Sequence, residues 1–363
     1  MKSLLLYRRT IFDGTTRKLP GVEKFLHYFK LYNQDVIPVD RTNTLKTPIN
    51  LLNLFPLPKL VPYKKKYEDI CNDRAKELLK KSTKLSAPIY VLYSGGIDST
   101  LVLVSLIKNS NSVEREKINV LISQASITEN PNFYENHILG KLNCLPSTSL
   151  RYILGTKNML VTGEHNDQIF GSDIIADFIR EFGEAAGDKK YDREKVLSFF
   201  NKRVPEPKLN LFYVNLFEEL CSKSPVEIKT NFQFFWWINF ALKWQNVSMR
   251  ILMFTREKNI TGINQEYIDK YLNHFYSTED FQLWSMNNLD KKWKGTWKTY
   301  KWPCKEIIYN FTGDSEYRDN KIKYGSLGSV IVGTHAMRYI EEGFRLTDTI
   351  NTAEYFNPNN SFL

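Results

Sequence analysis

The sequence predicts an α/β protein in which a parallel, doubly wound sheet is joined to a C-terminal helical part and a small irregular N-terminal region. From residue 67 onward short apolar runs alternate with amphipathic segments, and two of the runs end in a polar turn that contains glycine. Strands that alternate with helices pair in parallel, because each crossover returns the chain to the same end of the sheet. Hydrophobic residues are 42% of the 363 residues and charged residues 25%, which excludes wholesale disorder.

Three parts of the chain differ in composition. Residues 1–66 contain six of the 14 prolines, and because proline removes a backbone donor we expect short strands and loops there. Residues 67–333 carry the alternating pattern and are expected to form the main domain. Residues 334–363 remain as a C-terminal tail.

The elements of the main domain follow from periodicity. Apolar residues at helical spacing indicate amphipathic helices, whereas apolar runs without alternation are typical of strands buried on both faces. The expected order is helix 67–81, strand 88–93, helix 101–107, strand 118–123, helix 132–142 and strand 159–162. Beyond residue 171 the chain turns helical, and Ser224-Pro225-Val226-Glu227 is typical of a capping box that starts a long helix running through residue 240.

The first polar turn, Ser94-Gly95-Gly96-Ile97-Asp98-Ser99-Thr100, follows an expected buried strand and precedes an apolar helix. Glycine allows a sharp bend and a close approach to a ligand, and the helix that follows presents free amides to a phosphate. The hydroxyls of Ser94, Ser99 and Thr100 can add donors. A bare carboxylate repels phosphate, so Asp98 indicates a divalent cation between the two, as Mg²⁺ takes carboxylates together with phosphate oxygens. The alternative is an ordinary strand-to-helix turn with an aspartate cap.

The second polar turn, Gly163-Glu164-His165-Asn166-Asp167-Gln168-Ile169-Phe170-Gly171, follows the expected strand 159–162. It therefore lies at the carboxyl end of a strand, where open α/β sheets bind ligands. The alternative is a helix N-terminus that is capped by Asn166 or Asp167.

The two turns resemble motifs of a known superfamily. The first resembles the SGGxDS loop of the PP-loop ATP pyrophosphatases, and the second resembles the GEGADExFGG motif of asparagine synthetases and β-lactam synthetases. This resemblance implies a fold of the HUP type. It implies that Asp98 and Asp167 hold Mg²⁺ and that Glu164 lies near the reacting acyl group. The residues that it assigns to ATP binding are Ser94, Gly95, Gly96, Asp98, Ser99, Thr100 and Gly163.

The second motif departs from the family pattern at three positions, and four later segments resemble the family more weakly. His165 and Asn166 replace two small residues of the second motif, and Gln168 replaces an acid. Four later segments resemble the same family less specifically, namely 244–250, 276–281, 301–305 and 318–325. In the family the last of these loops supplies a lysine to the transition state, for which Lys323 is the better match and Lys321 the second.

The resemblance implies an AMP-forming carbon–nitrogen ligase that uses ATP and Mg²⁺. A small-molecule carboxylate would be adenylated, pyrophosphate would leave, and ammonia or an amine would take the acyl group. Glutamine-dependent members carry a cysteine nucleophile directly after the initiator methionine, whereas this chain has Lys2 there and no cysteine before Cys71. We therefore expect no glutamine hydrolysis, so the nitrogen would come from free ammonia, from a separate ammonia-supplying partner or from an amine acceptor.

Nucleic acid is a second kind of partner that the sequence leaves open. The net charge of +10 favours polyanions, and residues 291–302 interleave lysines with aromatic residues, a pattern that can track a phosphate backbone and stack bases. However, Trp293, Trp297 and Tyr300 are also at helical spacing, which favours a core face. An enzyme that modifies tRNA or DNA and a non-catalytic ATP-binding protein therefore remain alternatives to the ligase.

Cysteine usage and the apolar runs bear on localisation. The four cysteines lie more than 70 residues apart, so no zinc or disulfide framework is expected. The first residues lack the apolar stretch of a secretory signal, and no apolar run approaches the roughly 20 residues that span a bilayer. We expect a cytoplasmic protein with no membrane segment.

Overall fold

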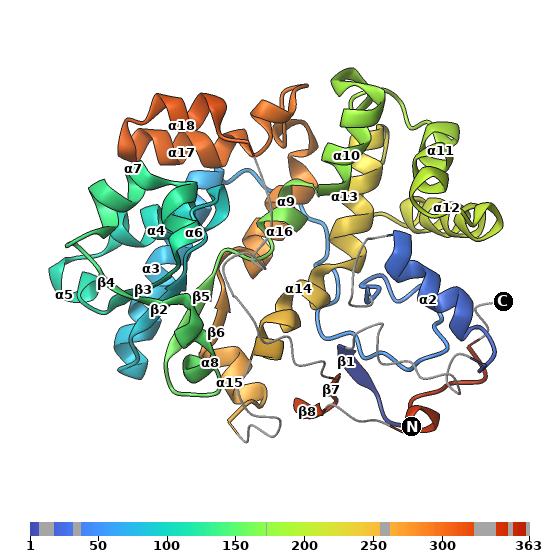
Figure 1. Cartoon of the computed structure of the whole chain (residues 1–363), viewed down its shortest axis with the longest axis horizontal. Coiled ribbons are helices and arrows are strands. Elements are labelled where there is room, and N and C mark those ends of the chain that lie inside the picture. Colours follow the sequence, from blue (N-terminus) through green and yellow to red (C-terminus); the bar gives the residue numbers. More distant parts are fainter. Residues whose placement is uncertain are drawn as a thin grey trace.

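The computed structural model describes residues 1–6, 18–31, 38–171, 173–254, 262–322, 339–347 and 351–360. It confirms the α/β class: a parallel five-stranded sheet carries helices, a helical part extends from it, and a small antiparallel sheet lies beside both (Figure 1). The sheet order is compatible with a Rossmann-like fold, the coarse form of the expected architecture.

The main sheet has the order β4-β3-β2-β5-β6, and its neighbouring strands all run parallel. Its strands are β2 (Ile89–Leu92), β3 (Ile118–Ile122), β4 (Asn143–Pro146), β5 (Met159–Thr162) and β6 (Leu272–His274). Val91 of β2 pairs with Val120 of β3 and with Val161 of β5, and all three side chains are fully buried. The chain adds strands on one side of β2 and then on the side of β5, so the order reverses between β2 and β5. Ligands of open α/β sheets bind at such a reversal.

The strands expected from apolar runs are confirmed as β2, β3 and β5. The sequence does not predict β4 and β6, because neither is an apolar run. β4 is a largely exposed edge strand that ends at Pro146. β6 ends in Asn273 and His274, both buried, and Lys81 Nζ donates to Asn273 Oδ1 at 2.7 Å. Polar partners rather than apolar side chains therefore place β6 at the sheet edge.

Helices beside the sheet pack mainly on one another. α3 (Tyr67–Leu85), α4 (Ile97–Asn109) and α17 (Trp302–Thr312) form one layer. The expected helix 132–142 is wrong as a single element: α7 (Pro131–Phe133) continues into a π-helical turn, Tyr134–Ile138, because the amide of Leu139 bonds to the carbonyl of Tyr134 (2.8 Å). The other helices of this part are α5 (Ser112–Arg115), α6 (Gln124–Glu129), α8 (Leu150–Ile153), α9 (Asn166–Phe170), α15 (Gln265–Lys270), α16 (Glu279–Asn287) and α18 (Ser315–Asn320).

The helical part is built around an aromatic core. Its helices are α10 (Asp173–Phe182), α11 (Arg193–Arg203), α12 (Pro207–Ser222), α13 (Asn231–Leu242) and α14 (Trp244–Arg250). The expected capping box at Ser224 is wrong, because the Ser224 hydroxyl accepts the amide of Val226 (3.2 Å) in a local turn. α13 instead begins at Asn231, with Thr230 as its N-cap and Gln233 completing the capping box. Short 3-10 turns occur at Ser147–Ser149, Glu184–Ala186, Ile251–Phe254, Phe275–Ser277, Leu289–Lys291, Trp297–Thr299 and Thr352–Glu354.

The two ends of the chain pair with each other. β1 (Leu4–Leu6) runs antiparallel to β7 (Tyr339–Glu341), which pairs with β8 (Arg345–Thr347). The N-terminal region also contains α2 (Val22–Leu31), a helix where the proline content predicts only loops and short strands; Pro20 lies just before α2, so no proline interrupts it. None of the helices within the described ranges is long and apolar enough to cross a membrane.

Candidate active site

The turn after β2 is shaped by glycine and by its own hydroxyls. Gly95 adopts φ = 77°, and Gly96 is the N-cap of α4. The amide of Ser94 donates to Ser99 Oγ (3.1 Å), and the two serine hydroxyls lie 3.0 Å apart. Thr100 is fully buried, and its hydroxyl lies 3.5 Å from the carbonyl of Gly95. The sequence-predicted loop residues therefore form one tight turn at the N-terminus of α4.

The turn after β5 places a histidine in the backbone region that favours glycine. His165 has φ = 77° and directly precedes α9. Its ring is buried, lies 4.4 Å from the Trp244 ring between centroids, and has Nε2 at 2.8 Å from Ser248 Oγ. The Ser248 hydroxyl donates to the Trp244 carbonyl (3.0 Å), so His165 Nε2 donates to Ser248. Contacts from α14 therefore hold His165 in this conformation.

The two turns lie against each other at the sheet reversal. A Cβ built on Gly163 would lie 3.0 Å from the amide nitrogen of Ser99 and 3.2 Å from Asp98 Cβ, so glycine permits the close approach. Asn166 Nδ2 donates to Asp98 Oδ1 at 2.6 Å, and Asn166 Oδ1 accepts the Tyr67 hydroxyl at 2.6 Å. Asn166 therefore bonds the second turn to the first rather than capping a helix.

Asp98 and Asp167 converge on one cation. Lys301 Nζ lies 2.6 Å from Asp98 Oδ1, 2.7 Å from Asp98 Oδ2 and 2.7 Å from Asp167 Oδ1. The lysine side chain is fully buried, whereas the two aspartate side chains are 23% and 31% exposed. One ammonium group thus offsets two carboxylates that remain accessible from one side.

The position of Lys301 is built into the start of α17. Its backbone is left-handed, with φ = 59°, and its amide donates to the carbonyl of Lys292 at 3.1 Å. Sequence reasoning did not assign Lys301 to the site, because it lies within the lysine- and aromatic-rich segment and 134 residues beyond Asp167. The faint signal was the likeness of residues 301–305 to a family helix that begins with lysine.

Glu164 lies at the same edge of the sheet and faces a different partner. Its Oε2 accepts Arg250 Nη2 at 2.6 Å, and its amide donates to the Thr162 hydroxyl at 3.3 Å. Glu164 is buried, and its Oε1 has no hydrogen-bond partner among the described residues. The carboxylate is therefore held by Arg250 on one oxygen, while the other oxygen is buried without a hydrogen-bond partner among the described residues.

Two histidines behind Glu164 are neutral. His274 Nε2 donates to the Ser248 carbonyl (2.9 Å), and its Nδ1 accepts the Thr162 hydroxyl (2.7 Å). Burial lowers the pKa of His274 to about 4. Burial, with the nearby His274, also lowers the pKa of His165 well below its usual range. These rings therefore support the second turn as uncharged groups.

The lysines that the resemblance assigns to the transition state are only partly described. Lys321 Nζ bonds to Glu129 Oε1 (2.5 Å) and to the Glu129 carbonyl (3.1 Å), and Glu129 packs beside Gly95. Lys321 is thus next to the first turn but is engaged by a carboxylate. Lys323 lies outside the described residues.

The lysine- and aromatic-rich segment is not a single helix with lysines in solvent. Trp293 is buried and stacks on Phe232 at 5.0 Å, and Tyr300 is buried as well. Lys292 is fully buried: its Nζ donates to the carbonyls of Ile169 (2.6 Å) and Ser285 (2.9 Å). The core interpretation of the aromatic residues is thus confirmed for Trp293 and Tyr300, although irregular turns rather than a helix carry them.

The described part of the chain contains no cluster of three or more His, Cys, Asp or Glu side chains able to hold a metal ion. A cation at Asp98 and Asp167 would therefore need further ligands from a substrate or from water. Cys304, 3.4 Å from Asn166 Nδ2, is buried, and burial raises the pKa of its thiol to about 12, so it is a poor nucleophile.

In comparisons with known proteins, no family model and no curated protein matches the chain.

Proposed function

We propose that the protein is an ATP-dependent ligase that adenylates a carboxylate substrate and passes the acyl group to ammonia or an amine. The observation that carries the proposal is the convergence of Asp98 and Asp167 on one cation, beside the N-terminus of α4 and at the reversal of a parallel sheet. Such a position combines a phosphate site with a cation site.

The second turn supports the resemblance to asparagine and β-lactam synthetases. Where that motif has glycine, His165 keeps the left-handed backbone that glycine favours. Where it has a second small residue, Asn166 bonds to the aspartate of the first turn. The replacements are therefore compatible with a left-handed residue 165 and with a direct contact between the two turns.

The donor set fits Mg²⁺. Carboxylate oxygens are the ligands that this ion prefers, and it usually keeps positions for phosphate oxygens and water. Asp98 and Asp167, which already share the Lys301 ammonium, would hold it. When bound, the ion would offset negative charge on the β- and γ-phosphates.

The chain's own residues would position and stabilise the reactants. The Gly95 amide and the α4 dipole would face the phosphates, the Gly96 amide, which donates to Ser94 Oγ in the structure, would have to turn to them, and Lys301 would add positive charge beside the departing pyrophosphate. In the first step a carboxylate oxygen attacks the α-phosphorus, and the bond from that phosphorus to the bridging oxygen breaks. In the second step an amine nitrogen attacks the acyl carbon, AMP leaves, and one proton is released. Glu164, one oxygen of which is buried without a hydrogen-bond partner among the described residues, would orient the acyl group or accept that proton.

The test is pyrophosphate release by the purified protein with ATP, Mg²⁺, ammonia and a panel of carboxylates. We expect one or more carboxylates to stimulate release, and Asp98→Asn to remove the stimulation. Asp177→Asn, which changes a half-exposed aspartate on α10, is the matched control and should leave release unchanged. Release that is equal in Asp98→Asn and in the unaltered protein would refute the proposal.

A second candidate is a protein that binds ATP without transferring its adenylyl group. Lys301 favours it, because an ammonium already occupies the point between the two carboxylates. The two candidates differ in how Mg²⁺ acts. A ligase should bind ATP more tightly with Mg²⁺ and release pyrophosphate, whereas the second candidate should bind ATP equally with and without Mg²⁺ and release none across the panel. Calorimetric titration of ATP in the presence and absence of Mg²⁺ separates them.

A nucleic-acid substrate has less support. Two aromatic residues that could stack bases, Trp293 and Tyr300, are buried in the core, and so is Lys292. Lys294 remains exposed, with Nζ over the Trp302 ring at 4.5 Å. Salt-dependent binding of RNA that Lys294→Gln weakens would restore this alternative.

A further inference from the structure

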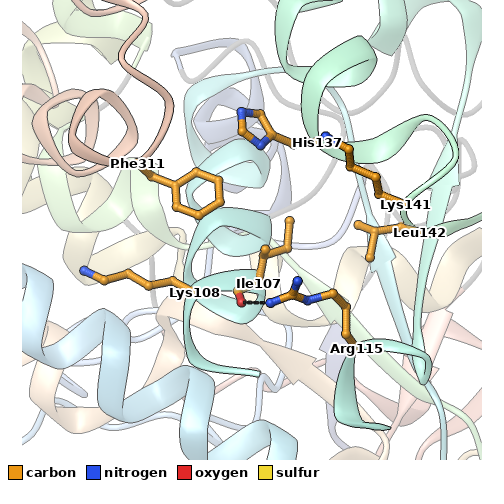
Figure 2. A pocket seen from close by; sticks show the side chains of 7 residues that line it. All are labelled: Ile107, Lys108, Arg115, His137, Lys141, Leu142 and Phe311. Atoms are coloured by element: carbon orange, nitrogen blue, oxygen red, sulfur yellow. Dashed lines mark hydrogen bonds between the residues drawn. The ribbon is translucent and has the colours of Figure 1, made fainter. Parts of the chain in front are cut away.

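A cavity of about 430 Å³ lies at the end of α4 that is remote from the two turns. Figure 2 shows the side chains around it, which come from α4, α5, the π-helical segment before β4, and α17. The lining residues are Ile107, Lys108, Arg115, His137, Lys141, Leu142 and Phe311. The volume is within the range of small-molecule sites.

Arg115 is held in place by backbone carbonyls and carries unpaired charge. Its Nη2 donates to the carbonyls of Ile107 (2.9 Å) and Ser110 (3.3 Å), and its Nε donates to Ser110 Oγ (3.3 Å). Among the described residues no carboxylate pairs with Arg115. Lys108, in contrast, is paired with Glu68 at 2.6 Å, and its amine points away from the cavity in Figure 2. The fixed guanidinium is therefore the main cationic group of this cavity.

Lys141 and His137 lie across the cavity from Arg115, and the Lys141 amine ends beside His137 (Figure 2). The Lys141 amine donates to the Asn136 carbonyl, and within the described ranges it has no carboxylate partner either. The His137 ring lies 5.0 Å from both the Phe133 and the Phe311 rings. A π-helical turn carries His137, and such turns occur often at functional sites.

The remaining walls are apolar. Ile107, Leu142 and Phe311 line the cavity together with the His137 ring. Two cations without carboxylate partners beside an aromatic wall match a ligand with an anionic head and a flat apolar body.

This cavity is distinct from the proposed active site. α4 begins at the first turn and ends at Ile107 to Asn109, and its 13 residues span roughly 20 Å. The cavity therefore lies beside the amino ends of β3 and β4, whereas Asp98 lies at the carboxyl edge of the sheet.

We propose that the cavity binds a small organic anion in which a phosphate or carboxylate group is attached to an aromatic body. Arg115 and Lys141 bind the anionic group, and Phe311, Ile107 and Leu142 contact the ring beside His137. This assignment does not depend on the ligase chemistry.

The experiment is a calorimetric titration of the full chain with phenyl phosphate, benzoate, inorganic phosphate and phenol, without ATP. We expect phenyl phosphate or benzoate to bind with a dissociation constant on the order of 1 mM or below. The isolated halves, inorganic phosphate and phenol, should bind at least about tenfold more weakly. The comparison of phenyl phosphate with benzoate distinguishes a phosphate head from a carboxylate head.

Variants locate the binding. Arg115→Gln and Lys141→Gln should each weaken binding about tenfold or more, and Phe311→Leu should weaken the aromatic probes but not inorganic phosphate. Arg151→Gln, which changes an exposed arginine beside Tyr152 on α8, is the matched control and should bind as the unaltered protein does. Arg115 also bonds to carbonyls at the C-terminal end of α4, so thermal melting of each variant must show a folded protein. Lys141→Gln provides an independent test if Arg115→Gln is unfolded. Binding that is equal in Arg151→Gln and Lys141→Gln, or no binding of either aromatic anion at about 10 mM, would overturn the proposal.

Discussion

The two turns at the sheet reversal reach the same backbone angle by opposite means. Gly95 and His165 both have φ = 77°. Gly95 needs no support, because glycine adopts this region freely and the hydrogen bonds of its turn join residues no more than five apart. His165 is held there by Ser248 and Trp244, which lie 83 and 79 residues further along the chain.

This difference shows that one site can combine a turn shaped by neighbouring residues with a turn held by residues far away in the sequence. The backbone of the first turn is shaped mainly by its own residues, so its conformation can be predicted from them, although its Asp98 carboxylate is bonded to Asn166 and Lys301. The second is assembled by contacts with α14, and its carboxylates are held by Arg250 and Lys301. We therefore expect the first turn to be sensitive to changes of backbone freedom and the second to changes in its distant partners.

The largest expected effect tests whether the two turns form one site. Under the ligase proposal Asp98→Asn and Asp167→Asn should each lower the rate of pyrophosphate release by about two to three orders of magnitude. Groups that act as a unit are not additive, so the double variant should lose little more than either single variant.

The measurement is single-turnover pyrophosphate release at saturating ATP. Additive losses in the double variant would indicate two independent contributions. A normal rate in Asp167→Asn alone would show that the second turn takes no part in pyrophosphate release.

Gly95→Ala should destabilise the protein by about 3 kcal/mol, since left-handed strain of 1–2 kcal/mol adds to a collision. A Cβ at Gly95 would collide with the Ser126 carbonyl and lie 2.7 Å from Glu129 Cβ. Gly140 is the matched control: its φ is 68°, and no atom lies within 4 Å of an added Cβ. Urea unfolding should show a loss of only about 1 kcal/mol for Gly140→Ala. Equal losses at the two positions would show that the collision relaxes.

Acid should destabilise the fold through His274, whose ring packs against His165 of the second turn. The pKa of His274 is about 4 in the folded chain against its ordinary 6.5, because burial disfavours the charged ring. The unfolded chain therefore binds the proton more readily, so the stability contributed by a neutral His274 is complete above pH 6.5 and declines as the pH falls toward 4. Between about pH 6.5 and pH 5 the loss should be about 2 kcal/mol.

The free energy of urea unfolding, measured across this pH range, checks the expectation. His274→Gln should show a smaller pH dependence than the unaltered protein, because residue 274 no longer titrates. An unchanged slope would assign the acid sensitivity to other groups, with the buried His165 the first to examine.

The features that can be predicted from the sequence are those that depend on residues close together in the chain. The strands β2, β3 and β5 are apolar runs, so the sequence predicts them. The glycines and Asp98 of the first turn likewise predict a tight turn from neighbouring residues alone. Lys301 could not be assigned, because only the folded chain brings the start of α17 to the end of β5. The buried lysine Lys292 could not be assigned either: its amine donates to carbonyls of α9 and α16, which no spacing rule connects.

The smallest expected effect concerns the strain of a left-handed residue with a Cβ, compared between positions 165 and 95. His165→Ala and His165→Gly both remove the ring and its contacts with Ser248 and Trp244, so both variants should be less stable than the unaltered protein. Only alanine retains the cost of a left-handed residue with a Cβ, so His165→Ala should be less stable than His165→Gly by about 1 kcal/mol. The difference between glycine and alanine, measured by urea unfolding, should thus be smaller at residue 165 than at residue 95, where a collision adds to the strain. If His165→Ala proves at least as stable as His165→Gly, the backbone must relax out of the left-handed region once the ring is gone. The contacts to α14, rather than the turn itself, would then determine the φ of residue 165.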